Sequence, residues 1–183
     1  MQENNYITMW TAQADRVWDT IERDGVYFVK REYVAQKYQD ISWIFNTAYR
    51  FFCQHASQII PRPENAESPV WLYHDQKWAV PSDGFPRKKL EIPVDEMILF
   101  DLRTWSKILN MDYVGSDKET ELFYAQCKKL GISDMLDITR TNFYPLQKKQ
   151  LQTSWKHLFS DPLPEELYWQ GAVWMLKKER IVI

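Results

Sequence analysis

The sequence predicts an α+β fold in a single domain over residues 1–183, with a small mixed or antiparallel sheet and several amphipathic helices packed around it. Segments with helical apolar spacing are interspersed with short β-branched and aromatic runs, without repeated strand–helix–strand units. No internal repeat or linker-like segment divides the chain. Nine Trp, ten Tyr and nine Phe are spread along it, and each such ring buries roughly 150–250 Å². They indicate one tightly built core, or a core plus an aromatic-walled cleft.

The first elements alternate between strand and helix. Ile7–Trp10 reads as a strand, and Thr11 is expected to cap the helix that follows. Apolar residues recur at helical spacing over Ala14–Ile21, and Gly25 is expected to end that helix. Val26–Val29 is β-branched and aromatic, which predicts a second strand.

The next stretch contains the clearest helix of the chain. A short polar helix is expected over Glu32–Lys37. Asp40 is then expected to cap a helix over Ile41–Ile59, which has a broad apolar stripe. Pro61–Pro69 is a loop by composition, and Val70–His74 is expected to form a strand.

Proline and glycine mark the segment after this strand. Trp78–Lys88 is predicted to be a mobile, lid-like loop. Leu90–Pro93 is expected to be extended, and Glu96–Phe100 reads as an apolar strand. That strand runs directly into Asp101, which can cap a helix over residues 102–109.

The C-terminal part is predicted to be mostly helical before a final strand. Asp117–Leu130 and Leu146–Phe159 read as helices, separated by irregular chain at Thr141–Pro145. Leu167–Leu176 carries apolar residues on both faces of the expected strand, which is typical of a strand buried on both sides.

Composition excludes several classes of function. The net charge is −2, whereas a general nucleic-acid binder carries a basic excess, so no nucleic-acid partner is expected. No apolar run approaches the ~20 residues that span a bilayer, so no membrane association is expected. Cys53 and Cys127 read as buried free thiols, and with no apolar signal region they predict a cytoplasmic protein. The three histidines lack metal-ligand spacing, so no metal site is predicted.

Polar residues beside indoles are the main candidates for a ligand site. Thr11 and Gln13 accompany Trp10, and Gln170 follows Trp169. If the first and last strands are neighbours, these groups converge on one cleft, and an aromatic wall with a few fixed polar groups is typical of small-molecule sites. The alternative is that the indoles belong to the core and Gln170 satisfies a buried backbone group.

Asp101 is a separate candidate because it follows a buried strand. It is expected at the mouth of the sheet, where ligands often bind, although the same carboxylate can simply cap its helix. A third hypothesis is a hydrolase or nuclease that uses Asp95, Glu96 and Asp101, and it requires a divalent cation.

A series of motifs along most of the chain resembles a known family. The series comprises Trp10-Thr-x-Gln13, Ala48-Tyr49, Val70-Trp71, Leu90–Leu99 leading into Asp101 and Trp105, Ser154-Trp155, and Gln170 with Trp174. It resembles the bacterial family known as domain of unknown function 3841. Leu90–Asn110 is the most specific part, and the resemblance implies no particular activity.

A fainter likeness links the N-terminal pattern to small ADP-ribosyltransferase-type domains. Met9–Thr11 followed by Gly25–Tyr27 looks like the start of such domains. Those domains bind NAD with a polar residue of the first strand and use a glutamate of a late strand. The likeness places Thr11 at the first position, where a His or Arg is usual; the late strand offers Gln170, and Glu179 lies beyond it.

Together these features predict a domain that binds a nucleotide or NAD-related ligand, with NAD as a possible cofactor. The expected ligand-binding residues are Trp10, Thr11, Gln13, Tyr49, Arg50, Trp71, Trp169 and Gln170. Trp10 and Tyr49 would stack on the base, and Arg50 would meet a phosphate. In a transferase, the catalytic candidates are Gln170, Glu179 and Asp101. The alternative is a non-catalytic protein-interaction module, such as an inhibitor or a toxin–antitoxin or defence-system component, whose exposed aromatic residues contact a protein partner.

Overall fold

The structure is a computed structural model that describes residues 5–32 and 38–182. In these residues a six-stranded sheet has the order β5-β6-β3-β1-β4-β8, and every neighbouring pair in it is antiparallel. Its strands are β1 (Tyr6–Ala12), β3 (Val70–Tyr73), β4 (Arg87–Pro93), β5 (Ile98–Asp101), β6 (Trp169–Val173) and β8 (Ile181–Val182). A second, two-stranded sheet pairs β2 (Val26–Tyr27) with β7 (Leu176–Lys177). The predicted α+β class is confirmed, and the sheet is antiparallel.

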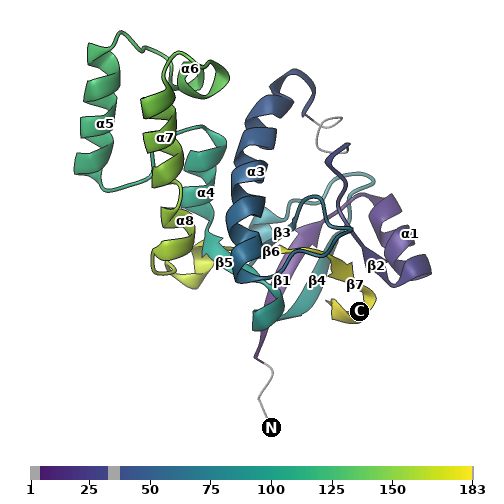
Figure 1. The fold of residues 1–183 in the computed structure, drawn as a ribbon. Coiled ribbons are helices and arrows are strands. Elements are labelled where there is room, and N and C mark those ends of the chain that lie inside the picture. Colours follow the sequence, from purple (N-terminus) through teal and green to yellow (C-terminus); the bar gives the residue numbers. More distant parts are fainter. Residues whose placement is uncertain (1–4, 33–37, 183) are drawn as a thin grey trace.

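Helices lie on the sheet and beside it (Figure 1). The helices are α1 (Asp15–Asp24), α3 (Ser42–Ile59), α4 (Leu102–Leu109), α5 (Asp117–Lys129), α6 (Met135–Arg140), α7 (Pro145–Ser154) and α8 (His157–Ser160). In Figure 1, α5, α6 and α7 form a separate group at the upper left, which we call the helical lobe.

The two faces of the sheet bury different cores. Ile98, Phe100 and Ala172 point to the face that packs against α3, α4 and α8. Met97, Leu99 and Val173 alternate with them and pack on the face that receives α1. Because side chains alternate along a strand, this division follows from the strand register.

The central strand β1 is held very differently by its two neighbours. It pairs with β4 along its whole length, from Tyr6 to Ala12. It meets β3 only where Trp10 lies opposite Tyr73. Beyond that pair, the C-terminal end of β1 and the N-terminal end of β3 share no further register, and this opening positions the candidate site.

Several element predictions are confirmed. The helix expected at Ala14–Ile21 is α1, and Gly25 ends it in the left-handed conformation at φ 77°. The long central helix is α3, and the strand leading into Asp101 is β5 followed by α4. The second strand is shorter than predicted because β2 covers only Val26–Tyr27.

Other predictions were wrong in detail. Thr11 does not cap α1, because β1 continues to Ala12 and Ala14 occupies the cap position. Asp40 does not cap α3 but lies in the 3₁₀ turn Gln39–Ile41 that precedes it.

The remaining differences lie in short helices. The helix expected over Leu146–Phe159 is interrupted at Trp155, which separates α7 from α8. The short helix α6 was not predicted. The helix predicted over Glu32–Lys37 falls largely on residues 33–37, outside the described residues.

Candidate functional site

A cavity of about 660 Å³ lies where β1 and β3 diverge. Its wall includes the end of β1, the start of α1, both ends of β3, and parts of α3 and α4. Small-molecule sites typically have volumes of roughly 300–1,000 Å³. The cavity is therefore large enough for a mononucleotide-sized ligand.

Aromatic rings dominate the wall. The aromatic lining residues are Tyr27, Tyr38, Phe45, Tyr49, Trp71, Tyr73, Phe85 and Trp105. Tyr49 connects two of the elements, because its ring lies 5.1 Å from Trp71 on β3 and 6.0 Å from Trp105 on α4. Such centroid distances are typical of favourable aromatic pairs, so the wall is held in shape by its own packing.

Two phenols of this wall, Tyr49 and Tyr73, are uncharged at neutral pH. Burial raises the pKa of Tyr49 well above its ordinary value, with a smaller contribution from the nearby Tyr38. Burial and the neighbouring Tyr38 likewise raise the pKa of Tyr73. Both hydroxyl groups therefore act as neutral hydrogen-bonding groups.

Thr11 connects β1 to β3 where regular pairing ends. Its Oγ1 donates a hydrogen bond to the Trp71 carbonyl oxygen at 3.0 Å and accepts one from Gln13 Nε2 at 2.8 Å. Thr11 is buried, so these bonds satisfy a hydroxyl that water does not reach. They also fix the Gln13 side chain in the wall of the cavity.

Two buried polar atoms of the wall have no hydrogen-bond partner within residues 5–32 and 38–182. They are Gln170 Oε1 on β6 and Ser68 Oγ, just before β3. Among the described residues only one other buried side-chain atom, Arg180 Nε, lacks a partner. A buried polar group without a partner destabilises a protein by about 1–3 kcal/mol, so its presence in a cavity wall points to a role there.

The charge of the wall is low. Arg16, exposed at the start of α1, is the one charged residue among the described residues of the lining, and no acid is among them. The described lining can thus surround an uncharged aromatic group.

Thr11, Gln13, Tyr49, Trp71 and Gln170 are the predicted ligand-binding residues that the structure brings together in this wall. They come from three strands, one helix and the segment after β1. β3 lies between β1 and β6, so these residues converge although the strand that carries Gln170 is not a direct neighbour of β1.

The other predicted ligand-binding residues lie elsewhere. Trp10 is not in the cavity wall, and the Arg87 guanidinium lies 5.5 Å from its ring centre. Arg50 lines a separate hollow of about 350 Å³ that shares Tyr49 and Ser68 with the cavity.

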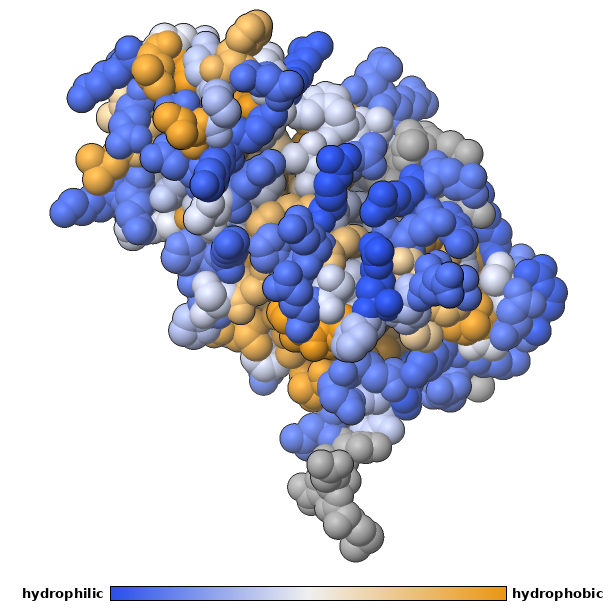
Figure 2. Space-filling model, in the orientation of Figure 1, coloured by the Kyte–Doolittle hydropathy of each residue, from blue (hydrophilic) through white to orange (hydrophobic). Residues whose placement is uncertain are grey.

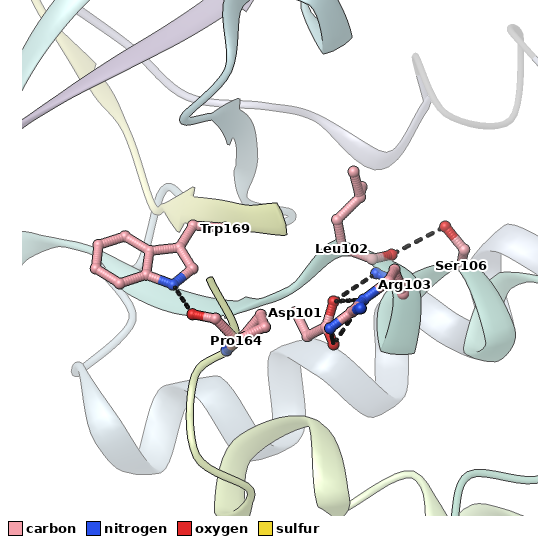
Figure 3. A network of polar contacts seen from close by, with 6 residues as sticks. All are labelled: Asp101, Leu102, Arg103, Ser106, Pro164 and Trp169. Carbon is pink, nitrogen blue, oxygen red and sulfur yellow. Dashed lines mark hydrogen bonds and ion pairs between the residues drawn. The ribbon is translucent and has the colours of Figure 1, made fainter. Parts of the chain in front are cut away.

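Trp169 and Asp101 have structural partners outside the cavity (Figure 3). Trp169 Nε1 donates a hydrogen bond to the Pro164 carbonyl at 2.8 Å. Asp101 caps α4 by accepting a hydrogen bond from Arg103 N at 2.8 Å, and it also forms an ion pair with the Arg103 guanidinium. Glu179 is exposed in the 3₁₀ turn Lys178–Arg180 and is not in the cavity wall.

Sequence reasoning missed several residues of the wall. Ser68 gave no signal because it lies in a Pro-rich loop. Trp105 was not among the predicted ligand-binding residues; it is buried, yet it also lines the cavity. Phe45 carried a signal that was not used, since it lies one helical turn before Tyr49 and therefore on the same face.

Three further features bear on metal binding, membranes and cysteine chemistry. Within residues 5–32 and 38–182, no group of three or more His, Cys, Asp or Glu side chains is placed to hold a metal ion. In the same ranges no helix combines the length and apolar character needed to cross a bilayer. Cys53 and Cys127 are buried free thiols, and burial raises the pKa of both. Cytoplasmic location stays a prediction.

Comparison with known protein families identifies the family of this chain. The family model described as Domain of unknown function (DUF3841) matches residues 8–182, almost the whole chain. The protein belongs to this family, as the motifs of the sequence suggested. No match was found among curated proteins or among solved structures.

Proposed function

We propose that this member of the DUF3841 family binds a nucleotide or NAD-related small molecule in the cavity between β1 and β3. The observation that carries the proposal is the coincidence of two features in one wall. Aromatic rings from several elements surround the cavity, and two of the three unpartnered buried polar atoms of the described chain belong to it.

Different residues of the wall suit different chemical groups of such a ligand. A planar base or nicotinamide ring packs against Tyr49 and Trp71, whose faces suit aromatic stacking. Polar groups of the ligand meet Gln13 and Gln170. A phosphate extends to Arg16 at the start of α1.

Binding is better supported than catalysis. General acid–base chemistry requires a titratable group within hydrogen-bond reach of the substrate. No acid is among the described residues of the wall, and Glu179 and Asp101 are not part of it. Transfer of ADP-ribose would therefore need a carboxylate from outside this lining.

Titration calorimetry with NAD, ADP-ribose, AMP and nicotinamide mononucleotide tests the proposal. Ser106→Phe places a large ring at the exposed rim of the cavity, whereas Lys107→Phe places the same ring one residue away on α4, outside the lining. We expect at least one ligand to bind the wild type and Lys107→Phe, and binding to be lost in Ser106→Phe. Absence of heat with all four ligands would contradict the proposal, as would equal binding by both variants.

A second candidate function is interaction with a protein through the helical lobe. Phe143 is 83% exposed and Leu146 is 70% exposed, and both lie beside α7 or at its start. Leu122 and Leu146 border a groove of about 580 Å³ between α5 and α7. Figure 2 shows apolar side chains gathered on the surface over this lobe. Exposed apolar groups of this kind often mark interaction surfaces.

Affinity purification from the native host tests this second function. We expect a stoichiometric partner to copurify with the wild type and to be lost with Phe143→Ser combined with Leu146→Ser. Val80→Ser is the matched control, because Val80 is equally exposed at 70% but lies outside the lobe. Recovery of no partner, or its retention by the double variant, would reject a role for this surface.

A further inference from the structure

Gln170 lies on an interior strand of the sheet, next to the edge strand β5. It lies on β6, opposite Tyr73 of β3 on one side and Phe100 of β5 on the other. Its backbone is thus fixed by hydrogen-bonded neighbours on both edges. Functional groups carried by such strands are positioned more accurately than groups on loops.

The side-chain amide of Gln170 is almost fully enclosed. Only 2% of the residue is exposed, yet Oε1 has no hydrogen-bond partner among the described residues. Ser68 Oγ, the other unpartnered atom of the wall, lies before the opposite end of β3, because Gln170 pairs with Tyr73 at the end of that strand. If position 170 served only the core, an apolar residue would be expected at it, since an amide oxygen without a partner is unfavourable in a buried site.

We infer that Gln170 selects the ligand by pairing its amide with a ligand edge that carries an N–H donor beside an acceptor. This inference rests on the proposed function and names the part of the ligand that enters the cavity. A glutamine amide offers one acceptor oxygen and one donor nitrogen, and rotation about its last bond presents either atom. The complementary edge is a primary carboxamide, as in nicotinamide, or the amino edge of adenine, with which glutamine forms two hydrogen bonds in DNA recognition.

The same wall disfavours a carboxylate at this position. The one cationic residue of the described lining, Arg16, is exposed on α1, while Gln170 is buried and uncharged. A carboxylate buried against this amide would lose its hydration without gaining an opposite charge. The site therefore distinguishes nicotinamide from nicotinic acid, and adenine from purine, which lacks the amino group.

Paired ligands that differ only at this edge test the inference. Calorimetry compares nicotinamide mononucleotide with nicotinic acid mononucleotide, and AMP with purine ribonucleoside monophosphate. A site built to hydrogen-bond a ligand group rejects the analogue that lacks it, so we expect the wild type to prefer the first member of at least one pair by about tenfold or more. Gln170→Leu should reduce that ratio to near one. Gln54→Leu, a matched change at an exposed position of α3 outside the cavity, should leave the ratio unchanged.

The outcomes separate this inference from the proposed function. Binding without preference in the wild type overturns the inference and leaves the proposed function standing. A preference that survives in Gln170→Leu likewise removes Gln170 as the selecting residue. If none of the four compounds binds, the inference is rejected, and the proposed function is rejected with it when NAD and ADP-ribose also give no heat.

Discussion

Helix α3 contributes rings to two aromatic clusters that differ in how their polar atoms are satisfied. Toward its C-terminal end, Phe51 packs against Trp155 at 5.3 Å and Phe159 at 6.2 Å between ring centres, and we call these three rings the closed cluster. In it, Trp155 Nε1 donates a hydrogen bond to the Asp112 carbonyl. Toward its N-terminal end, Phe45 and Tyr49 face the open cluster around the cavity. There, two buried polar atoms of the wall have no partner. The core and the candidate site are both aromatic, and they differ in whether their buried polar atoms have hydrogen-bond partners.

The largest effect should come from the closed cluster. Trp155 is fully buried, so Trp155→Ala removes a large packed ring and is expected to lower the free energy of unfolding by about 3–5 kcal/mol. Urea denaturation measures it. Trp78→Ala, at a site that is 42% exposed, is the control and should change stability by about 0.5 kcal/mol or less. Similar losses in both variants would mean that the closed cluster is not a core.

An intermediate effect is expected where the open cluster is hydrogen-bonded. Thr11→Val keeps the shape of the side chain but leaves the Trp71 carbonyl and the Gln13 amide without their partner. We expect a loss of about 1–3 kcal/mol in urea denaturation, the usual penalty for breaking such buried bonds. Thr20→Val, where an exposed hydroxyl binds the Arg16 carbonyl, is the matched control. A loss no greater than in the control would show that Thr11 does not hold the wall.

Gln170→Leu should not lower the free energy of unfolding, unlike the two preceding variants. It replaces a buried amide that lacks a partner with an apolar side chain of similar size. We expect stability to be unchanged or to rise by up to about 1 kcal/mol, because no intramolecular hydrogen bond is lost. Thermal and urea denaturation check this. A clear loss of stability would show that Gln170 serves the fold, and the contrast between the two clusters would fail.

The smallest effect concerns the third unpartnered atom, which lies outside the cavity. Arg180 Nε has no partner, but Arg180 Nη2 binds Glu96 at 2.6 Å and Lys177 binds the same carboxylate at 3.0 Å. Burial alone would raise the pKa of Glu96, but the hydrogen bonds from these two cations hold it below its ordinary value. The Arg180 guanidinium is thus held by an ion pair within the protein, through Nη2 and Glu96, and needs no ligand to neutralise its charge.

The lowered pKa of Glu96 sets the direction of the pH dependence. The carboxylate stabilises the folded state above its unfolded pKa, and the contribution is lost as the pH falls through the lower folded pKa. Glu96→Gln should therefore be less stable than the wild type at neutral pH by under about 1 kcal/mol, since the pair is partly exposed. In urea denaturation the difference should disappear in acid. A difference that does not vary with pH would contradict an ionic origin, and the neighbouring Asp95→Asn serves as control.

Local patterns in the sequence predicted much of the fold. Apolar spacing and Gly25 located α1, and the apolar stripe located α3, because these signals lie within a few turns of chain. The break at Trp155 was not predicted, since that residue turns away to bind the Asp112 carbonyl, 43 residues earlier in the chain. Such a contact leaves no periodic trace in the sequence.

The candidate site was predictable only in part. Polar residues beside indoles identified Thr11, Gln13 and Gln170, which line the cavity, but also Trp10 and Trp169, which do not. Adjacent side chains of a strand lie on opposite faces, so Trp169 points away from Gln170. Trp10 lies opposite Tyr73, a residue of the wall, yet it is not itself in the lining. The divergence of β1 from β3 creates the cavity, and it depends on pairing between distant segments that no local pattern encodes.

The most direct test follows the indole and side-chain amide signals of the protein by nitrogen–proton NMR during titration with AMP and nicotinamide mononucleotide. If the cavity binds such ligands, the signals of Trp71, Trp105 and Gln170 should shift in a saturable manner, because these residues line it. The indole signals of Trp155 and Trp174, which are bound to backbone carbonyls in the core, should stay in place. No saturable shift with either ligand, or equal shifts at Trp155 and Trp71, would contradict the account.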